Sequence, residues 1–178
     1  MPSKKVQFTN ANGYTLSAKI EMPANQHPHT FAIFAHCFTC SKNLLAVRQI
    51  SRSLITQGIA LLRFDFTGLG ESEGDFADTN FSTNLKDIYA AADFLKEHYQ
   101  APKILIGHSL GGAAMLHAAC NIDSVAAIAT IGAPYNPIHV HHLFSDNLEA
   151  IHAEGQAEVN LGGRAFTVKK QFLDDLKN

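Results

Sequence analysis

The stretch Gly107-His108-Ser109-Leu110-Gly111-Gly112 decides how this sequence folds. The apolar run at 103–108 leads into the serine and predicts a strand buried on both faces. A run of mostly small residues at 109–120 follows and predicts a helix. A serine between such a strand and helix lies on a sharp turn with a strained backbone, and the glycines beside it leave room for the two elements to cross.

The segments around this unit alternate between the patterns of strands and helices. Apolar runs predict further strands at 30–35, 59–66 and 125–131. Residues 4–9 and 14–22 flank the turn-rich tetrapeptide 10–13 and predict a hairpin. Apolar side chains at spacings of three and four predict helices at 44–57 and 81–99. Strands separated by helices predict an α/β fold with a mostly parallel sheet and an antiparallel hairpin at one edge.

Composition limits the class of protein. The chain has 178 residues, 46% of them apolar, and a formal net charge of −2. This length and apolar content suffice for one domain with a hydrophobic core. The balanced charge excludes polyanion binding as the main function, so we expect no nucleic-acid partner. No apolar run reaches the roughly 20 residues of a membrane span, so we expect no membrane partner. With three cysteines and no visible secretory signal, we expect a cytoplasmic location.

The G-x-S-x-G spacing, set between a strand and a helix, is typical of a nucleophile elbow. Ser109 is then the nucleophile, and Gly107 and Gly111 are the glycines that the turn requires. The start of the following helix favours negative charge, which suits an oxyanion formed beside the serine. The alternative is an ordinary glycine-rich turn between a strand and a helix. We favour the elbow because the motif and its context agree.

The loop after the strand at 30–35, His36-Cys37-Phe38-Thr39-Cys40-Ser41, is the second candidate. In hydrolases with this elbow, the corresponding loop donates a backbone N–H to the oxyanion hole. We expect Phe38 to be that donor and Leu110 to be the second, with His36 ordering the loop rather than acting as the base. Cys37 and Cys40 are either a redox pair or two free thiols. We favour free thiols.

Other polar residues have two interpretations each. Asp65 follows a buried strand, where it is either the catalytic acid or, as we favour, a residue whose carboxylate shapes the next loop. The histidines of the last third either bind a metal or are exposed imidazoles: His139, His141, His142 and His152. We favour exposed imidazoles, and so expect no metal and no cofactor.

The motifs together resemble the α/β-hydrolase fold. They are most similar to the hydrolase half of bacterial proteins in which such a domain is fused to an OsmC-like domain. The resemblance is carried by residues 36–43, 63–76, 106–114, 130–134 and 159–172. It implies helices on both faces of the sheet, a lid or insertion at 135–170, and supporting positions at His36, His108, Asp65, Gly107 and Gly111.

The resemblance also implies two strands that the sequence does not contain. In the family the catalytic acid and histidine follow those strands, so the acid and base of the triad are unknown here. We therefore expect residues 1–178 to form a single, incomplete hydrolase domain. The implied function is hydrolysis of a small ester or thioester by Ser109. The alternatives are a catalytically incomplete fragment and a subunit completed by a partner, with self-association through the sheet edge at 125–131.

Overall fold

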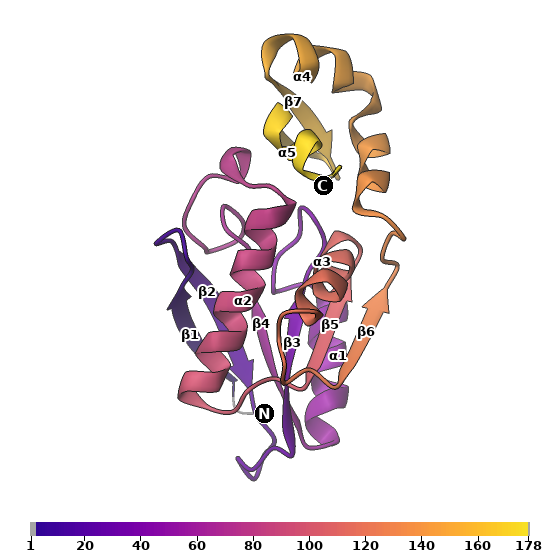
Figure 1. The fold of residues 1–178 in the computed structure, drawn as a ribbon. Coiled ribbons are helices and arrows are strands. Elements are labelled where there is room, and N and C mark those ends of the chain that lie inside the picture. The colour runs from indigo at the N-terminus through magenta and orange to yellow at the C-terminus, as the bar shows by residue number, and fades with distance from the viewer. Residues whose placement is uncertain (1–2, 178) are drawn as a thin grey trace.

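A six-stranded sheet in the order β1-β2-β4-β3-β5-β6 organises the computed structural model, which describes residues 3–177 (Figure 1). The strands are β1 (Ser3–Thr9), β2 (Thr15–Glu21), β3 (Thr30–Ala35), β4 (Ile59–Phe64), β5 (Ile104–His108) and β6 (Ala127–Ile131). The first two form an antiparallel hairpin, and β2 also pairs antiparallel with β4. The β4-β3-β5-β6 pairs are parallel, so the predicted mostly parallel sheet with an N-terminal hairpin is confirmed.

Helices cover both faces of this sheet, as predicted. They are α1 (Leu45–Thr56), α2 (Phe81–His98) and α3 (Leu110–Ala119). Strand β3 shows why both faces are covered, because its side chains alternate between two cores. Ala32 and Phe34 pack with Val47 of α1. Ile33 and Ala35 point to the other face, where the core includes residues of α2 and α3. A continuous apolar strand of this kind is stable only when both faces are buried.

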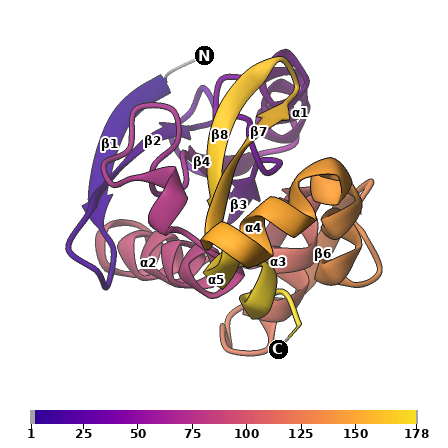
Figure 2. The same cartoon turned by 90° about the horizontal axis from the view of Figure 1, so that it is seen from above.

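The last fifth or so of the chain forms a smaller layer above the sheet, called here the upper segment (residues 137–175). It consists of the 3₁₀ helix η2 (Pro137–Asn147), α4 (Leu148–Glu154), β7 (Gln156–Leu161), β8 (Arg164–Lys169) and α5 (Lys170–Asp175). Seen from above, the β7–β8 hairpin crosses over the sheet (Figure 2). The upper segment contacts α2 through Asp175, whose carboxylate accepts hydrogen bonds from the Ser82 N–H and the Ser82 hydroxyl, each at 2.7 Å. Its role as a lid stays a prediction.

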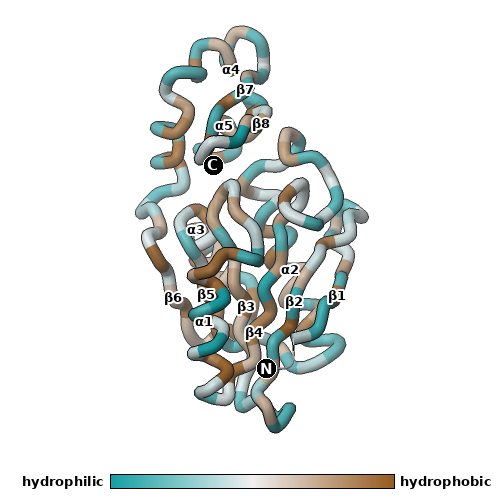
Figure 3. The backbone as a smooth tube through the Cα atoms, turned by 180° about the vertical axis from the view of Figure 1, so that it is seen from behind, coloured by the Kyte–Doolittle hydropathy of each residue, from teal (hydrophilic) through white to brown (hydrophobic). Residues whose placement is uncertain are grey.

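Strand β6 is the open edge of the sheet. All five of its residues are exposed, although most are apolar, and the strand is largely brown in Figure 3. Ile128 and Ile131 are 38% and 43% exposed. Within residues 3–177, β6 pairs only with β5. In the same part of the chain, no helix is long and apolar enough to cross a membrane.

Candidate active site

Ser109 lies at the junction between β5 and α3. Its backbone angles, φ 53° and ψ −127°, belong to a region that side-chain-bearing residues rarely adopt. Such a conformation costs on the order of 1–3 kcal/mol and persists only where the surroundings impose it. Here the Ser109 N–H donates to the main-chain oxygen of Ile131 at 2.9 Å, and the main-chain oxygen of Ser109 accepts from the Gly112 N–H at 2.8 Å. The strained turn is thus held between β6 and the first turn of α3.

The glycines beside Ser109 are required by close backbone contacts. A Cβ at Gly107 would lie 2.5 Å from the main-chain oxygen of Gly111, where β5 and α3 cross. A Cβ at Gly111 would collide with the main-chain oxygen of His36. This second contact brings the start of α3 directly against the end of β3, so the turn of Ser109 and the loop after β3 lie side by side.

His36 is buried at the start of that loop and is 1% exposed. The backbone N–H of Phe66 donates to its Nε2 at 3.4 Å, so Nδ1 carries the proton and donates to the Cys37 oxygen at 2.8 Å. Burial is the largest influence on this imidazole and lowers its pKa, although the Cys37 bond and the nearby Asp65 oppose the shift. A neutral His36 with both ring nitrogens engaged connects two loops.

Two buried residues, Phe38 and Leu110, have backbone N–H groups without an acceptor in the described part of the chain. Phe38 is 9% and Leu110 is 2% exposed, and neither N–H donates to any residue between 3 and 177. For Leu110 this is expected, because the first N–H groups of a helix lack partners within it. An unpaired buried loop N–H such as that of Phe38 is uncommon. Both residues line one small cavity of about 10 Å³, room for about one water molecule.

The Phe38 side chain joins the loop to the upper segment. Its ring centroid lies 5.2 Å from Phe76, 5.9 Å from Phe144 and 4.8 Å from Phe172. Such aromatic contacts each contribute about 0.5–1.5 kcal/mol beyond the burial of area. The upper segment is therefore packed directly onto the residue that carries the unpaired N–H.

Arg164, on β8, makes a polar contact with the same loop. Its guanidinium donates a hydrogen bond to the main-chain oxygen of Thr39 and lies 5.2 Å from the ring centroid of Phe166. Sequence reasoning missed this residue. A lone arginine after a glycine pair has no periodicity or spacing that predicts a partner 125 residues earlier.

Asp65 lies in a buried polar cluster below the loop. Its carboxylate is fully buried, accepts from the Lys42 N–H at 2.7 Å and the Glu71 N–H at 3.0 Å, and forms an ion pair with the Lys42 ammonium. Its hydrogen bonds to loop backbone are those of a residue that shapes loops. The buried Lys42 ammonium also binds Glu71 and lowers the pKa of that carboxyl to about 2. Lys42 carries no sequence signal.

The expectation of two free thiols beside Phe38 is wrong, because a disulfide joins Cys37 to Cys40. The reason is the turn between them: the Cys40 N–H donates to the Cys37 oxygen at 3.0 Å, which brings the two Cα atoms to 5.3 Å. That separation is within the range of disulfides. Cys120 is free and exposed.

The Ser109 hydroxyl makes no hydrogen bond with any residue in 3–177, so no histidine of the described chain is bonded to it. His108 precedes Ser109 on β5 and is close enough to His36 to help lower its pKa. His141 Nε2 lies 3.4 Å from the Leu173 oxygen, and His142 bonds to the His139 oxygen, so these rings contact their own segment. Over the described chain, no group of three or more His, Cys, Asp or Glu side chains is arranged so that it could hold a metal ion.

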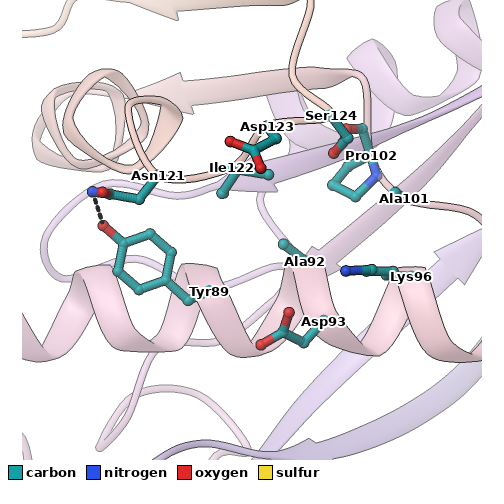
Figure 4. Close-up of a pocket in the computed structure, with 10 residues that line it drawn as sticks. All are labelled: Tyr89, Ala92, Asp93, Lys96, Ala101, Pro102, Asn121, Ile122, Asp123 and Ser124. Carbon is teal, nitrogen blue, oxygen red and sulfur yellow. Dashed lines mark hydrogen bonds between the residues drawn. The ribbon is translucent and has the colours of Figure 1, made fainter.

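A larger hollow of about 360 Å³ lies elsewhere, between α2 and the segments that lead into β5 and β6 (Figure 4). Tyr89 and Asn121 meet across it, with the Asn121 amide donating to the Tyr89 hydroxyl at 3.0 Å. Pro102 and Ser124 line its other end. Pro102 and Ser124 come before β5 and β6, whereas Ser109 follows β5. The hollow therefore lies at the N-terminal ends of these strands, opposite to the end that carries Ser109.

Comparisons with known proteins bear on the family. Residues 27–176 match the family of serine aminopeptidases (S33). The esterase domain of a Rhodothermus marinus protein is 50% identical, with a TM-score of 0.75 over 99% of this chain and 68% of that one. The structure of mouse α/β-hydrolase domain-containing protein 10 superposes with a TM-score of 0.77 at 23% identity, covering 98% of this chain and 69% of that one.

A curated mouse protein, the mitochondrial palmitoyl-protein thioesterase ABHD10, is 32% identical over 120 residues, 67% of this chain. The match spans 36% of that mouse protein and 24% of its rat counterpart, so the chain covers about a third or less of these relatives. The narrower resemblance to OsmC-like fusion proteins stays a prediction. The family match over most of the sequence and the sheet order agree: the chain belongs to the serine aminopeptidase (S33) family of α/β-hydrolases.

Proposed function

We propose that Ser109 accepts the acyl group of an ester or thioester, and that the N–H groups of Phe38 and Leu110 stabilise the oxyanion that forms. The observation that carries this proposal is a pair of buried residues with unpaired N–H groups, Phe38 and Leu110, which line one cavity, and of which Leu110 directly follows the strained Ser109. Preorganised donors of this kind are worth about 10²–10³-fold each in acyl transfer. The ester and thioester names of two relatives support this substrate class.

In this proposal, His36 and Asp65 have positioning roles. His36 is neutral and bonded on both nitrogens, so it is not available as a base for Ser109. Asp65 is fully engaged with backbone and Lys42. No general base is assigned within residues 3–177, and without one a serine hydroxyl is a weak nucleophile at neutral pH. The cavity beside Phe38 is also small and is lined by the aromatic side chains of Phe38, Phe66 and Phe76, so an acyl chain must displace side chains that line it.

The test is labelling by a fluorophosphonate together with turnover of p-nitrophenyl butyrate, p-nitrophenyl palmitate and a palmitoyl thioester. We expect slow labelling that Ser109→Ala abolishes, and turnover no more than roughly 10³–10⁴-fold above water, as in hydrolases that lack triad members. Robust Ser109-dependent turnover by a monomer would show that a base exists within the chain. Labelling equal in the wild type and Ser109→Ala would refute the assignment of the nucleophile.

A second candidate is a subunit that is completed by a partner, and the exposed β6 favours it. Apolar strands with an unpaired edge add further strands from other chains. We propose self-association through Ala127–Ile131 as its simplest form. Sedimentation of the wild type and an Ile128→Lys variant tests this: we expect oligomers that the lysine disperses. A monomeric wild type at high concentration would exclude it.

A further inference from the structure

The turn that carries the Phe38 N–H is closed by a covalent bond. Cys37 and Cys40 form the disulfide, and Phe38 and Thr39 are the two residues between them. The Cys40 N–H also donates to the Cys37 oxygen at 3.0 Å. The N–H proposed as an oxyanion donor therefore lies inside a small ring closed by one covalent and one hydrogen bond.

Residues around this turn bind two of its main-chain oxygens and pack against the Phe38 ring. His36 binds the oxygen of Cys37, and Arg164 binds the oxygen of Thr39. The Phe38 ring is packed among aromatic side chains. Within residues 3–177, no acceptor holds the Phe38 N–H itself. Its direction is set by the backbone of the turn, which the disulfide constrains.

The two sulfur-bearing residues are reachable from solvent. Cys37 and Cys40 are each partly exposed, whereas Phe38 between them is buried. Thiol–disulfide exchange needs access of a thiolate to one sulfur of the pair. Cys120 lies apart at the end of α3, so it does not compete for this pairing in the structure.

We propose that Cys37–Cys40 is a reversible redox site that reacts with dithiols and their disulfides and sets the geometry of the oxyanion turn. The consequence for catalysis rests on the proposed function of Ser109. A thiolate of the dithiol attacks one sulfur and breaks the S–S bond, which forms a mixed disulfide. The second thiolate then attacks that mixed disulfide. Two electrons and two protons pass to the protein, giving two cysteine thiols and the oxidised dithiol, and the reverse reaction closes the turn.

Reduction removes the covalent constraint while leaving the hydrogen bonds and the aromatic packing. The Phe38 N–H then samples more directions, and a misplacement of about 1 Å can cost as much as 10²-fold in rate. Because the packing remains, we expect a loosening rather than the loss of a donor. The reduced form should react about three- to tenfold more slowly at Ser109, with unchanged affinity for the reagent.

The experiment uses the full chain in a Cys120→Ser background, so that only this pair can react with thiol reagents. The protein is oxidised with diamide or reduced with dithiothreitol, and thiols are counted by alkylation and mass spectrometry. Two readouts follow: hydrogen–deuterium exchange of residues 36–42, and fluorophosphonate labelling resolved into a maximal rate and an affinity. The control is Cys37→Ser/Cys40→Ser in the same background.

We expect a disulfide after oxidation, faster exchange of residues 36–42 in the reduced form, and a lower maximal labelling rate at constant affinity. The double-serine control should match the reduced form and ignore dithiothreitol. Two free thiols after oxidation, or equal exchange in both forms, overturns the proposal whatever Ser109 does. Equal labelling rates despite different exchange overturn the catalytic link. Different exchange with no labelling in either form supports the redox site and counts instead against the function proposed for Ser109.

Discussion

The guanidinium of Arg164 donates a hydrogen bond to the main-chain oxygen of Thr39, which lies 125 residues earlier in the chain. Arg164 belongs to β8 of the upper segment, and Thr39 follows Phe38 in the loop after β3. The contact therefore connects the segment above the sheet to the loop that carries the proposed oxyanion donor. Together with the packing of Phe172 on Phe38, it makes the position of that loop depend on the upper segment.

Loss of this contact should slow acyl transfer more than it weakens binding. We expect Arg164→Ala to lower the maximal rate of fluorophosphonate labelling about three- to tenfold, with unchanged affinity, because the loop is displaced by a fraction of an ångström. Arg164→Lys should recover part of the rate. Arg48→Ala, on the exposed face of α1, is the matched control and should behave as wild type. An affinity change alone would argue against a positioning role.

Gly111→Ala should damage both stability and the site. The added Cβ meets the His36 backbone oxygen, which cannot move without shifting β3, so we expect a loss of about 1–3 kcal/mol in the free energy of unfolding. Labelling of Ser109 should fall below detection. Gly13→Ala, in the turn between β1 and β2, is the control: its Cβ would meet no atom within 4 Å, so its positive φ costs stability without affecting labelling. Urea unfolding measures the first effect, and a labelled Gly111→Ala protein would contradict the second.

Lys42→Met should be strongly destabilising, because it leaves the carboxylate of Asp65 buried without its ion-pair partner. Breaking a buried pair in this way costs about 3–5 kcal/mol. The double variant Lys42→Met/Asp65→Asn should be more stable than Lys42→Met alone. Lys86→Met, at an exposed position of α2, is the control. Equal unfolding free energies for Lys42→Met and Lys86→Met would show that the buried pair contributes nothing.

His36 should make stability depend on pH. Burial holds its pKa below the usual 6.5 despite the opposing Asp65, while Lys42 and His108 act in the same direction as burial. As pH falls below 6.5, the unfolded chain takes up a proton before the folded chain does, so the free energy of unfolding decreases. Above pH 6.5 this contribution is constant.

Unfolding in urea between pH 5 and 8 tests this, with His36→Gln expected to lose the component of the slope that lies below pH 6.5. His98→Gln, at an exposed site on α2, should retain it. Parallel pH profiles for the wild type and His36→Gln would mean that the imidazole is protonated as readily in the folded chain as in the unfolded one.

Local patterns were sufficient to predict the sheet. Continuous apolar runs such as Thr30–Ala35 became strands buried on both faces, and the predicted and observed bounds of this strand coincide. The glycine spacing around Ser109 was also sufficient to predict a strand–turn–helix junction, because a turn this tight tolerates no side chain at Gly107. Both inferences depend on periodicity and steric exclusion, which act between residues close in sequence.

Contacts between distant segments were decided only by the tertiary structure. One expectation also failed within a single loop: Cys37 and Cys40 are only three residues apart, and the turn between them brings their Cα atoms to 5.3 Å, so they form a disulfide rather than two free thiols. The burial of Lys42 and the reach of Arg164 to Thr39 carry no local signal. A charged side chain is placed by whichever partner the fold brings within hydrogen-bond distance, since burying it alone costs more than any local preference supplies. By itself the sequence determined the strands, the helices and the serine turn, whereas only the tertiary structure decided that the upper segment packs on the loop after β3.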